Sequence, residues 1–239
     1  MQDSDLGVSE DGLTRLADDL DQMQGHLERQ IRDMDRVVDS IAAGWPIDQV
    51  SWEAAVRHLY EDGCAFNATG PRRHEDWQAD VLAVMERAVP DPRGWIGLDD
   101  TAGYDYLAER PAFPFRPPFK ADPCRRLTPA DVGERLWEID RASAENLLLA
   151  LTDSGCTLRN LERFTESFDE LQGMARTILA RYGDTFTCYS NVSEARRVGT
   201  LDFGGQPMGW VPMTFFGEDC GLVVVSDTEV GLFWAFGDI

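Results

Sequence analysis

The chain is almost without lysine, since Lys120 is the only one among 239 residues. Twenty-one arginines supply the remaining basic groups, against 43 aspartates and glutamates, so the formal net charge is −21. Direct binding to nucleic acid needs many basic side chains to neutralise phosphates. The composition therefore argues against a nucleic-acid-binding function.

Long apolar runs and paired cysteines are missing as well. No stretch approaches the roughly 20 apolar residues of a membrane-spanning helix, and the first dozen residues lack the basic and apolar regions of a signal peptide. The five cysteines are scattered and form no CxxC pair, unlike those of a secreted disulfide scaffold. These absences predict a cytoplasmic protein that does not contact a membrane.

Sequence motifs for catalysis are absent too. No phosphate-binding GxxxxGK[ST], dinucleotide-binding GxGxxG, GxSxG or HExxH occurs. The three histidines, His26, His58 and His74, lack the paired spacing of zinc ligands, even when Cys64 is counted with them. We therefore predict no cofactor and no metal, and the sequence favours a protein without catalytic activity, although it leaves an enzyme open.

Residues 10–43 carry the clearest structural pattern. Apolar side chains alternate at spacings of three and four, which predicts an amphipathic helix of about nine turns. Carboxylates off the apolar stripe form an acidic face, and these residues are Asp18, Asp21, Glu28, Asp35 and Asp39. The stripe fits packing on the protein's own core better than a coiled-coil homodimer, which remains the alternative.

Residues 48–183 are predicted to be helical, with an irregular loop at 90–126. Helices are expected to begin near Ser51, Glu75, Thr128, Ser143 and Thr157, several of which suit the first position of a helix. The segment RPAFPFRPPFK at 110–120 favours an extended backbone. Its three phenylalanines are expected to hold this loop against the core.

Residues 184–239 have the pattern of strands. The runs TFTCYS, GWVPMTFF, GLVVV and EVGLFWAF are separated by glycine, aspartate and serine, and a hairpin turn is expected at Ser226–Thr228. Pro212 cannot donate a ladder hydrogen bond, so its strand should be an edge strand or carry a bulge. The prediction is one α+β domain over residues 1–239, with helices packed on a C-terminal antiparallel β-meander.

Two functions remain compatible with this sequence. A compact acidic protein without catalytic motifs fits an inhibitor, antitoxin-like or immunity-type protein that neutralises a basic partner such as a toxin or nuclease, and the acidic face of helix 10–43 is the predicted docking surface. The alternative is an enzyme or small-ligand-binding protein with its site in the 99–126 loop. The candidate ligand residues there are Asp99, Asp100, Tyr104, Asp105, Arg116, Arg125 and Arg126.

The acidity also has explanations unrelated to a partner. Aspartate is more frequent than glutamate, at 27 against 16, and lysine is nearly absent, as in proteins adapted to a salt-rich habitat. High net charge also keeps proteins soluble whatever they bind. The basic pairs Arg72-Arg73 and Arg125-Arg126 are expected to pair internally with acidic helices rather than to bind an anionic ligand.

Overall fold

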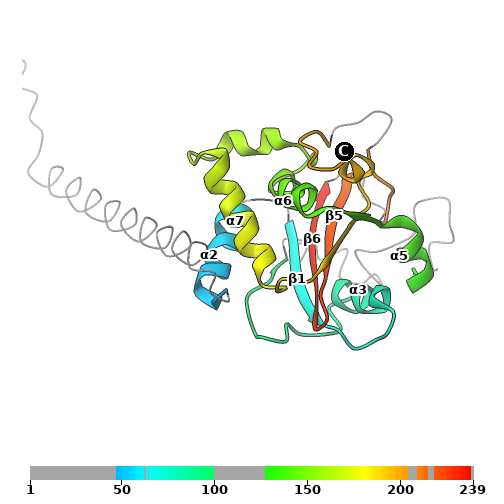
Figure 1. Cartoon of the computed structure of the whole chain (residues 1–239). Coiled ribbons are helices and arrows are strands. Elements are labelled where there is room, and N and C mark those ends of the chain that lie inside the picture. The colour runs from blue at the N-terminus through cyan, green and yellow to red at the C-terminus, as the bar shows by residue number, and fades with distance from the viewer. Residues whose placement is uncertain are drawn as a thin grey trace, which may run out of the picture. The chain divides into compact units, whose positions relative to one another are not determined.

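Six antiparallel strands form one sheet at the centre of the computed structural model (Figure 1). The structure describes residues 47–61, 63, 65–99, 127–203, 209–214 and 218–237. The strand order across the sheet is β2-β1-β6-β5-β4-β3. The strands are β1 (Ala65–Pro71), β2 (Leu98–Asp99), β3 (Trp137–Ile139), β4 (Thr187–Ser190), β5 (Glu218–Val225) and β6 (Glu229–Gly237).

The last three strands form the predicted C-terminal meander. β4 pairs with β5 and β5 pairs with β6, in the order in which they follow along the chain. Val225 lies opposite Val230, and the Ser226 N–H donates to the Glu229 carbonyl at 2.9 Å, which closes the expected hairpin turn. The α+β fold class is therefore confirmed.

Helices cover both faces of the sheet, which explains why its strands are apolar on both sides. On one face, the Tyr60 ring of α2 lies 6.4 Å from Phe233, and α6 and α7 pack beside α2 (Figure 1). On the other face, α3 carries Trp77, which stacks on Tyr189 at 4.3 Å. The helices are α2 (Gln49–Tyr60), α3 (Trp77–Met85), α5 (Pro129–Arg135), α6 (Arg141–Ala150) and α7 (Phe168–Ala180), with 3₁₀ turns η2 (Leu158–Arg163) and η3 (Ser193–Arg196).

Capping residues set where two of these helices begin. Thr128 and Asp131 form a capping box at α5, with Pro129 at the first helical position, where its missing N–H costs little. Ser167 and Glu170 form a second capping box at α7. The serine hydroxyl and its backbone N–H lower the pKa of Glu170 by hydrogen bonding to its carboxylate.

Two strands, β1 and β3, lie in segments of 48–183 that were predicted to be helical, so that prediction is wrong in this detail, and β2 lies in the predicted irregular loop. β1 has the sequence AFNATGP, which contains asparagine, glycine and proline, yet it is held between β2 and β6. The helix expected from Thr128 stops at Arg135, because Leu136 is extended and the next three residues pair with β4.

The helix expected from Thr157 is interrupted. It begins as the 3₁₀ turn η2, and α7 starts afresh after Ser167. Gly183 adopts a φ of +83°, the left-handed conformation expected at the end of such a helix.

The strand predicted around Pro212 is not formed within 209–214. A single bridge between Val192 and Trp210 marks this segment. The N–H groups of Met213 and Thr214 donate to the Asp219 carboxylate rather than to a neighbouring strand. A buried side chain thus takes the hydrogen bonds that a strand ladder would use.

The predicted helix over 10–43 lies outside the described residues. The single domain over 1–239 and the homodimer through that helix therefore stay predictions.

Candidate functional site

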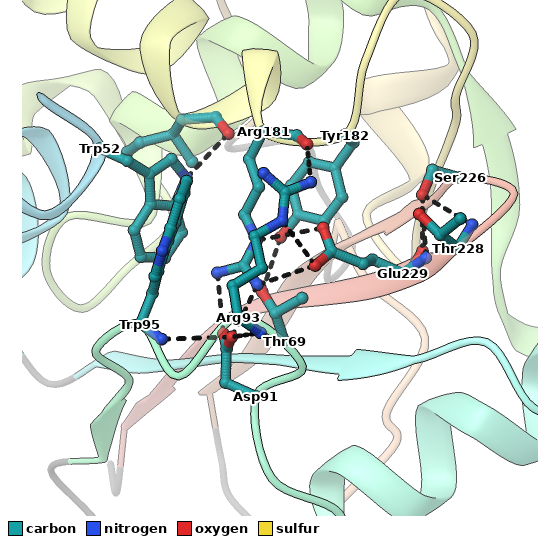
Figure 2. Close-up of polar contacts among 11 residues, drawn as sticks. Trp52, Thr69, Asp91, Arg93, Trp95, Arg181, Tyr182, Ser226, Thr228 and Glu229 are labelled. Atoms are coloured by element: carbon teal, nitrogen blue, oxygen red, sulfur yellow. Dashed lines mark hydrogen bonds and ion pairs between the residues drawn. The ribbon is translucent and has the colours of Figure 1, made fainter. Parts of the chain in front are cut away.

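The side chain of Arg181 lies at a junction of three segments that are far apart in the sequence (Figure 2). Arg181 is the residue that ends α7, and Gly183 turns the chain away two residues later. α7 is amphipathic, with Met174, Ile178 and their neighbours buried against the sheet and α2. The end of this helix therefore places a guanidinium inside the protein, where none of its side chain is exposed.

Two carboxylates neutralise the buried guanidinium. Glu229, the first residue of β6, accepts from Arg181 Nε at 3.2 Å and from Nη2 at 3.1 Å. Asp91 accepts from Nη2 at 2.9 Å, and its other oxygen lies 2.8 Å from Nη1. A guanidinium that meets carboxylates through two nitrogens is held in both distance and orientation.

Two tryptophan rings line one side of the same guanidinium (Figure 2). Its central carbon lies 4.9 Å from the ring centre of Trp52 on α2 and 4.8 Å from that of Trp95. The two ring centres are 5.4 Å apart. Trp52 is itself fixed, because its indole N–H donates to the Ile178 carbonyl at 3.1 Å. The rings supply cation–π attraction and keep water from the charge.

A second arginine extends the cluster toward the surface. Arg93 donates from Nε to Glu229 at 2.9 Å and from Nη2 to the Arg181 carbonyl at 2.8 Å, while its guanidinium lies 5.0 Å from the Trp95 ring centre. Its side chain is 36% exposed. We call Trp52, Asp91, Arg93, Trp95, Arg181 and Glu229 the Arg181 cluster.

The Arg181 cluster is suited to holding segments together rather than to transferring protons. Burial acts to lower the pKa of Arg181, but hydrogen bonds to Asp91 and Glu229 outweigh it and raise the pKa above its usual range. Arg181 therefore stays charged, and its charge is balanced by the two carboxylates. The cluster fixes the segment 91–95 to α2, to the end of α7 and to the start of β6.

Tyr182 continues the buried network on the sheet. Its hydroxyl shares a hydrogen bond of 2.9 Å with Thr69 of β1, and burial raises its pKa well above the usual range. Gly231 lies directly beneath the ring, and a Cβ at this position would overlap the Tyr182 hydroxyl. Tyr182 is therefore a packed, neutral side chain at physiological pH.

Asp80 and His74 form a second polar cluster, at the start of α3. The Asp80 carboxylate is 2% exposed and accepts from His74 Nδ1 at 2.6 Å and from Arg72 Nε at 3.2 Å. It also accepts the backbone N–H groups of Arg73 and His74. These contacts fix the orientation of the His74 imidazole and leave its other ring nitrogen toward solvent. The Asp80 carboxylate also caps the turn before α3.

A third polar centre lies in the sheet. Asp219 of β5 is fully buried and accepts from the Trp234 indole at 2.6 Å, besides the two backbone N–H groups of 213 and 214. Burial raises the pKa of Asp219 to about 6, although these donors act to lower it. Its carboxylate organises the 209–214 segment against the sheet.

The structure answers the sequence predictions in part. Asp99, the one candidate ligand residue among those described, is held by Arg87, whose Nε and Nη2 donate to its two oxygens at 2.6 and 2.9 Å. The ion pair of Arg72 with Asp80 confirms the expected internal pairing of that arginine. The other candidate ligand residues lie outside the described part, and they are Asp100, Tyr104, Asp105, Arg116, Arg125 and Arg126.

The docking residues predicted on helix 10–43, from Asp18 to Asp39, also lie outside the described residues. Of the residues weighed as metal ligands, His58 lies with its Nε2 3.1 Å from a carboxylate oxygen of Glu166. Across the described ranges, no three His, Cys, Asp or Glu residues gather closely enough to hold a metal ion. No helix in those ranges is long and apolar enough to span a membrane.

Comparisons with protein-family models, with curated proteins and with solved structures give no match to this chain.

Sequence reasoning missed the Arg181 cluster altogether. An arginine at the end of an amphipathic helix is usually a surface residue, and its partners lie 90 and 48 positions away. Asp219 did carry a signal, since a carboxylate stands inside the apolar run that leads into GLVVV.

Proposed function

We propose that this protein binds and neutralises a basic protein partner, in the way an inhibitor or immunity-type protein neutralises a toxin or nuclease. One observation supports the proposal most directly. The described residues include 26 aspartates and glutamates and 13 arginines, so acidic side chains outnumber basic ones two to one within the described fold.

The arginines are used largely within the fold. Arg181, Arg93, Arg72 and Arg87 each form ion pairs with carboxylates of the same chain. Arg163 donates to the backbone carbonyls of Leu59 and Thr152, and further arginines pair along or between helices. Such contacts pair much of the positive charge with carboxylates and carbonyls of the same chain.

Acidic side chains remain exposed over many elements. Those in the exposed class are Asp48, Glu61, Glu75, Asp76, Glu86, Glu134, Glu138, Glu162, Asp169, Glu170, Asp184, Asp202 and Asp227. Opposite charge on a partner would accelerate association with such a surface, and added salt would slow it.

The region from Glu162 to Glu170 is the best docking surface among the described residues, and we call it the acidic segment. It carries exposed carboxylates at Glu162, Asp169 and Glu170, and between them Phe168, an aromatic side chain that is 38% exposed at the start of α7. A partly exposed aromatic residue among charged ones is a common anchor in protein interfaces.

Affinity capture of a partner, followed by measurement of its binding kinetics, tests the proposal. The immobilised protein is incubated with lysate of its native cells at about 50 mM salt, bound proteins are identified by mass spectrometry, and the purified partner is then measured by surface plasmon resonance. We expect a basic partner whose association rate falls at least tenfold between about 50 and 500 mM salt, because screening lengths shrink over this range. Failure to capture a basic protein at low salt would contradict the proposal.

Matched variants separate a docking surface from net charge alone. Glu162→Lys with Asp169→Lys changes the acidic segment, and Glu134→Lys with Asp227→Lys makes the same change of charge on α5 and on the β5–β6 turn. The first pair should weaken binding at least tenfold more than the second. Equal effects would remove the acidic segment as the docking surface while leaving a charge-driven partner in place.

A further inference from the structure

A histidine and a carboxylate come together where the acidic segment meets α2. His58 Nε2 lies 3.1 Å from a carboxylate oxygen of Glu166, and the two side chains are 27% and 14% exposed. The Nε2 atom itself is buried, yet it forms no hydrogen bond with any residue in the described ranges. A buried ring nitrogen thus lies beside a carboxylate without the hydrogen bond that would satisfy it.

The Glu166 carboxylate is held from its other side. Thr165 donates its backbone N–H to Oε2 of Glu166 at 3.1 Å, and its hydroxyl donates to the same oxygen at 3.4 Å. The oxygen nearest His58 is the other one, Oε1. The segment itself therefore orients one carboxylate oxygen toward the histidine.

Two further features attract a positive charge to the His58 ring. His58 is in the last turn of α2, where the carbonyl end of the helix carries partial negative charge. Its ring centre lies 5.5 Å from that of Phe164, and aromatic rings attract cations. Histidine is also the side chain whose charge ordinarily changes between pH 5 and 8. Uptake of a proton by His58 would therefore add an attraction at this junction.

Charged groups on the surrounding elements have their own contacts. Arg57 pairs with Glu61 at 3.0 Å on α2, and Glu170 accepts the hydroxyl and N–H of Ser167 at the start of α7. Glu166 is the carboxylate that the structure places within ion-pair distance of His58. The full set of charged residues around the junction is Arg57 and Glu61 on α2, Asp153 after α6, Arg159, Glu162 and Arg163 on η2, Glu166 itself, and Asp169 and Glu170 on α7.

A second attachment beside this contact does not depend on pH. Arg163 Nη2 donates to the carbonyls of Leu59 and Thr152 at 2.7 and 3.0 Å, and its guanidinium lies 4.6 Å from the Phe164 ring centre. Arginine stays charged at every physiological pH, so this attachment persists whatever the charge of His58. The contact of His58 with Glu166 is therefore the part of the junction that pH can strengthen or weaken.

We propose that His58 and Glu166 form a pH-sensitive latch that fixes the acidic segment against α2. Near pH 5.5, where histidines are ordinarily protonated and carboxylates remain ionised, the two side chains attract each other and the latch is closed. Near pH 7.5 the neutral ring loses this attraction, and the segment opens more often.

The latch regulates the docking surface, and in this respect it rests on the proposed function. The acidic segment carries Phe168 and its neighbouring carboxylates on the far side of the junction with α2 along the chain. A segment that is already ordered costs less to immobilise when a partner binds. Closure of the latch should therefore raise the affinity for a basic partner.

Hydrogen exchange of the protein alone tests the latch. Exchange of the backbone amides in 158–171 is followed by mass spectrometry in the natural protein and in Glu166→Gln at pH 5.5 and pH 7.5, and the ratio of the two rates at each pH removes the direct effect of pH on exchange. These amides should exchange faster in Glu166→Gln by about fivefold at pH 5.5, the factor expected for a partly exposed charge contact at a helix end, and by less than about twofold at pH 7.5. Equal ratios at the two pH values would overturn the proposal.

Two variants assign the effect to its residues. Glu134→Gln makes the same change of charge on α5 and should give ratios close to one at both pH values. His58→Gln should show the same pH dependence as Glu166→Gln. If the ratio for His58→Gln does not change with pH, another group is titrating and the latch is overturned.

A separate measurement tests regulation of docking. The affinity of the captured basic partner for the natural protein, relative to its affinity for Glu166→Gln, should be about fivefold higher at pH 5.5 than at pH 7.5, in parallel with the exchange result. If exchange responds to pH but this relative affinity does not, the latch does not regulate docking. Failure to capture any basic partner contradicts the proposed function instead, and the exchange result stands without it.

Discussion

Replacing Arg181 by methionine should destabilise the protein by about 3 kcal/mol. Removing one partner of a buried ion pair costs about 3–5 kcal/mol, because the remaining charge is left without compensation. Contacts that remain after the substitution place the expected loss at the lower end of this range. Arg93 stays 2.9 Å from Glu229, and Asp91 keeps the backbone N–H groups of Arg93 and Trp95. Methionine has a similar length and retains apolar contact with the tryptophan rings.

Urea denaturation followed by tryptophan fluorescence measures this cost. With an m-value of about 2 kcal/mol/M, the midpoint should fall by about 1.5 M. Arg176→Met is the control, since Arg176 also pairs with a carboxylate, at 3.0 Å, but its side chain is 47% exposed. An exposed pair of this kind contributes less than about 1 kcal/mol. Equal losses in the two variants would refute the argument that burial makes the Arg181 pair important.

A double variant isolates the cause. Glu229→Gln added to Arg181→Met removes one of the stranded charges while keeping a polar side chain of similar shape. If uncompensated charge is responsible, the double variant should be more stable than Arg181→Met by about 1 kcal/mol or more. If the double variant is less stable than the single one, the remaining Arg93–Glu229 pair is stabilising, and uncompensated charge at Glu229 is not the cause of the loss.

Three further changes test other buried groups. Because burial raises the folded-state pKa of Asp219 to about 6 from 3.8, the folded protein binds more protons than the unfolded chain between these values. Its contribution to the free energy of unfolding should therefore fall by about 2 kcal/mol as pH rises from about 4 to about 6, and the difference between the pH profiles of the natural protein and Asp219→Asn should show this slope; parallel profiles would exclude it. Asn67→Leu should raise stability by about 1–3 kcal/mol in urea denaturation, because the Asn67 amide is 2% exposed and lacks a hydrogen-bond partner; a loss would mean that an internal water satisfies the amide. Gly231→Ala should lower stability by about 1–3 kcal/mol through overlap with the Tyr182 hydroxyl, and adding Tyr182→Phe should recover part of that loss; if it recovers none, the clash is with the ring.

The meander was predictable from sequence because its strands are continuous apolar runs that turn at Ser226–Thr228. β1 was not, because Asn67, Gly70 and Pro71 are uncommon in strands and the segment reads as a loop. β1 is a strand only because it pairs with the neighbouring strands of the sheet. β6 pairs with it along its whole length, and Phe66 reaches the core beside Val81 and Trp234.

The polar centres were hidden for a similar reason. The contacts of Arg181 join residues whose separation in the chain leaves no local pattern, and an ion pair has no periodicity by which it could be found. The helix start at Thr128 and the helix end at Gly183 depend on adjacent residues, and both boundaries were predicted correctly. Where a residue's role is set by a neighbour from another segment, sequence patterns alone did not identify it.

The position of β1 has a consequence for how the protein is made. β1 lies among the early residues of the described fold but pairs with β6, the last strand, and Ala65 lies opposite Ala235. During synthesis, β1 therefore waits until β6 has been made before its principal neighbour exists. Pairings this distant slow folding and leave unpaired strand edges open to aggregation. The hairpin of β5 and β6 is the last part of the described sheet to be synthesised, and its arrival is the step that allows the sheet to close.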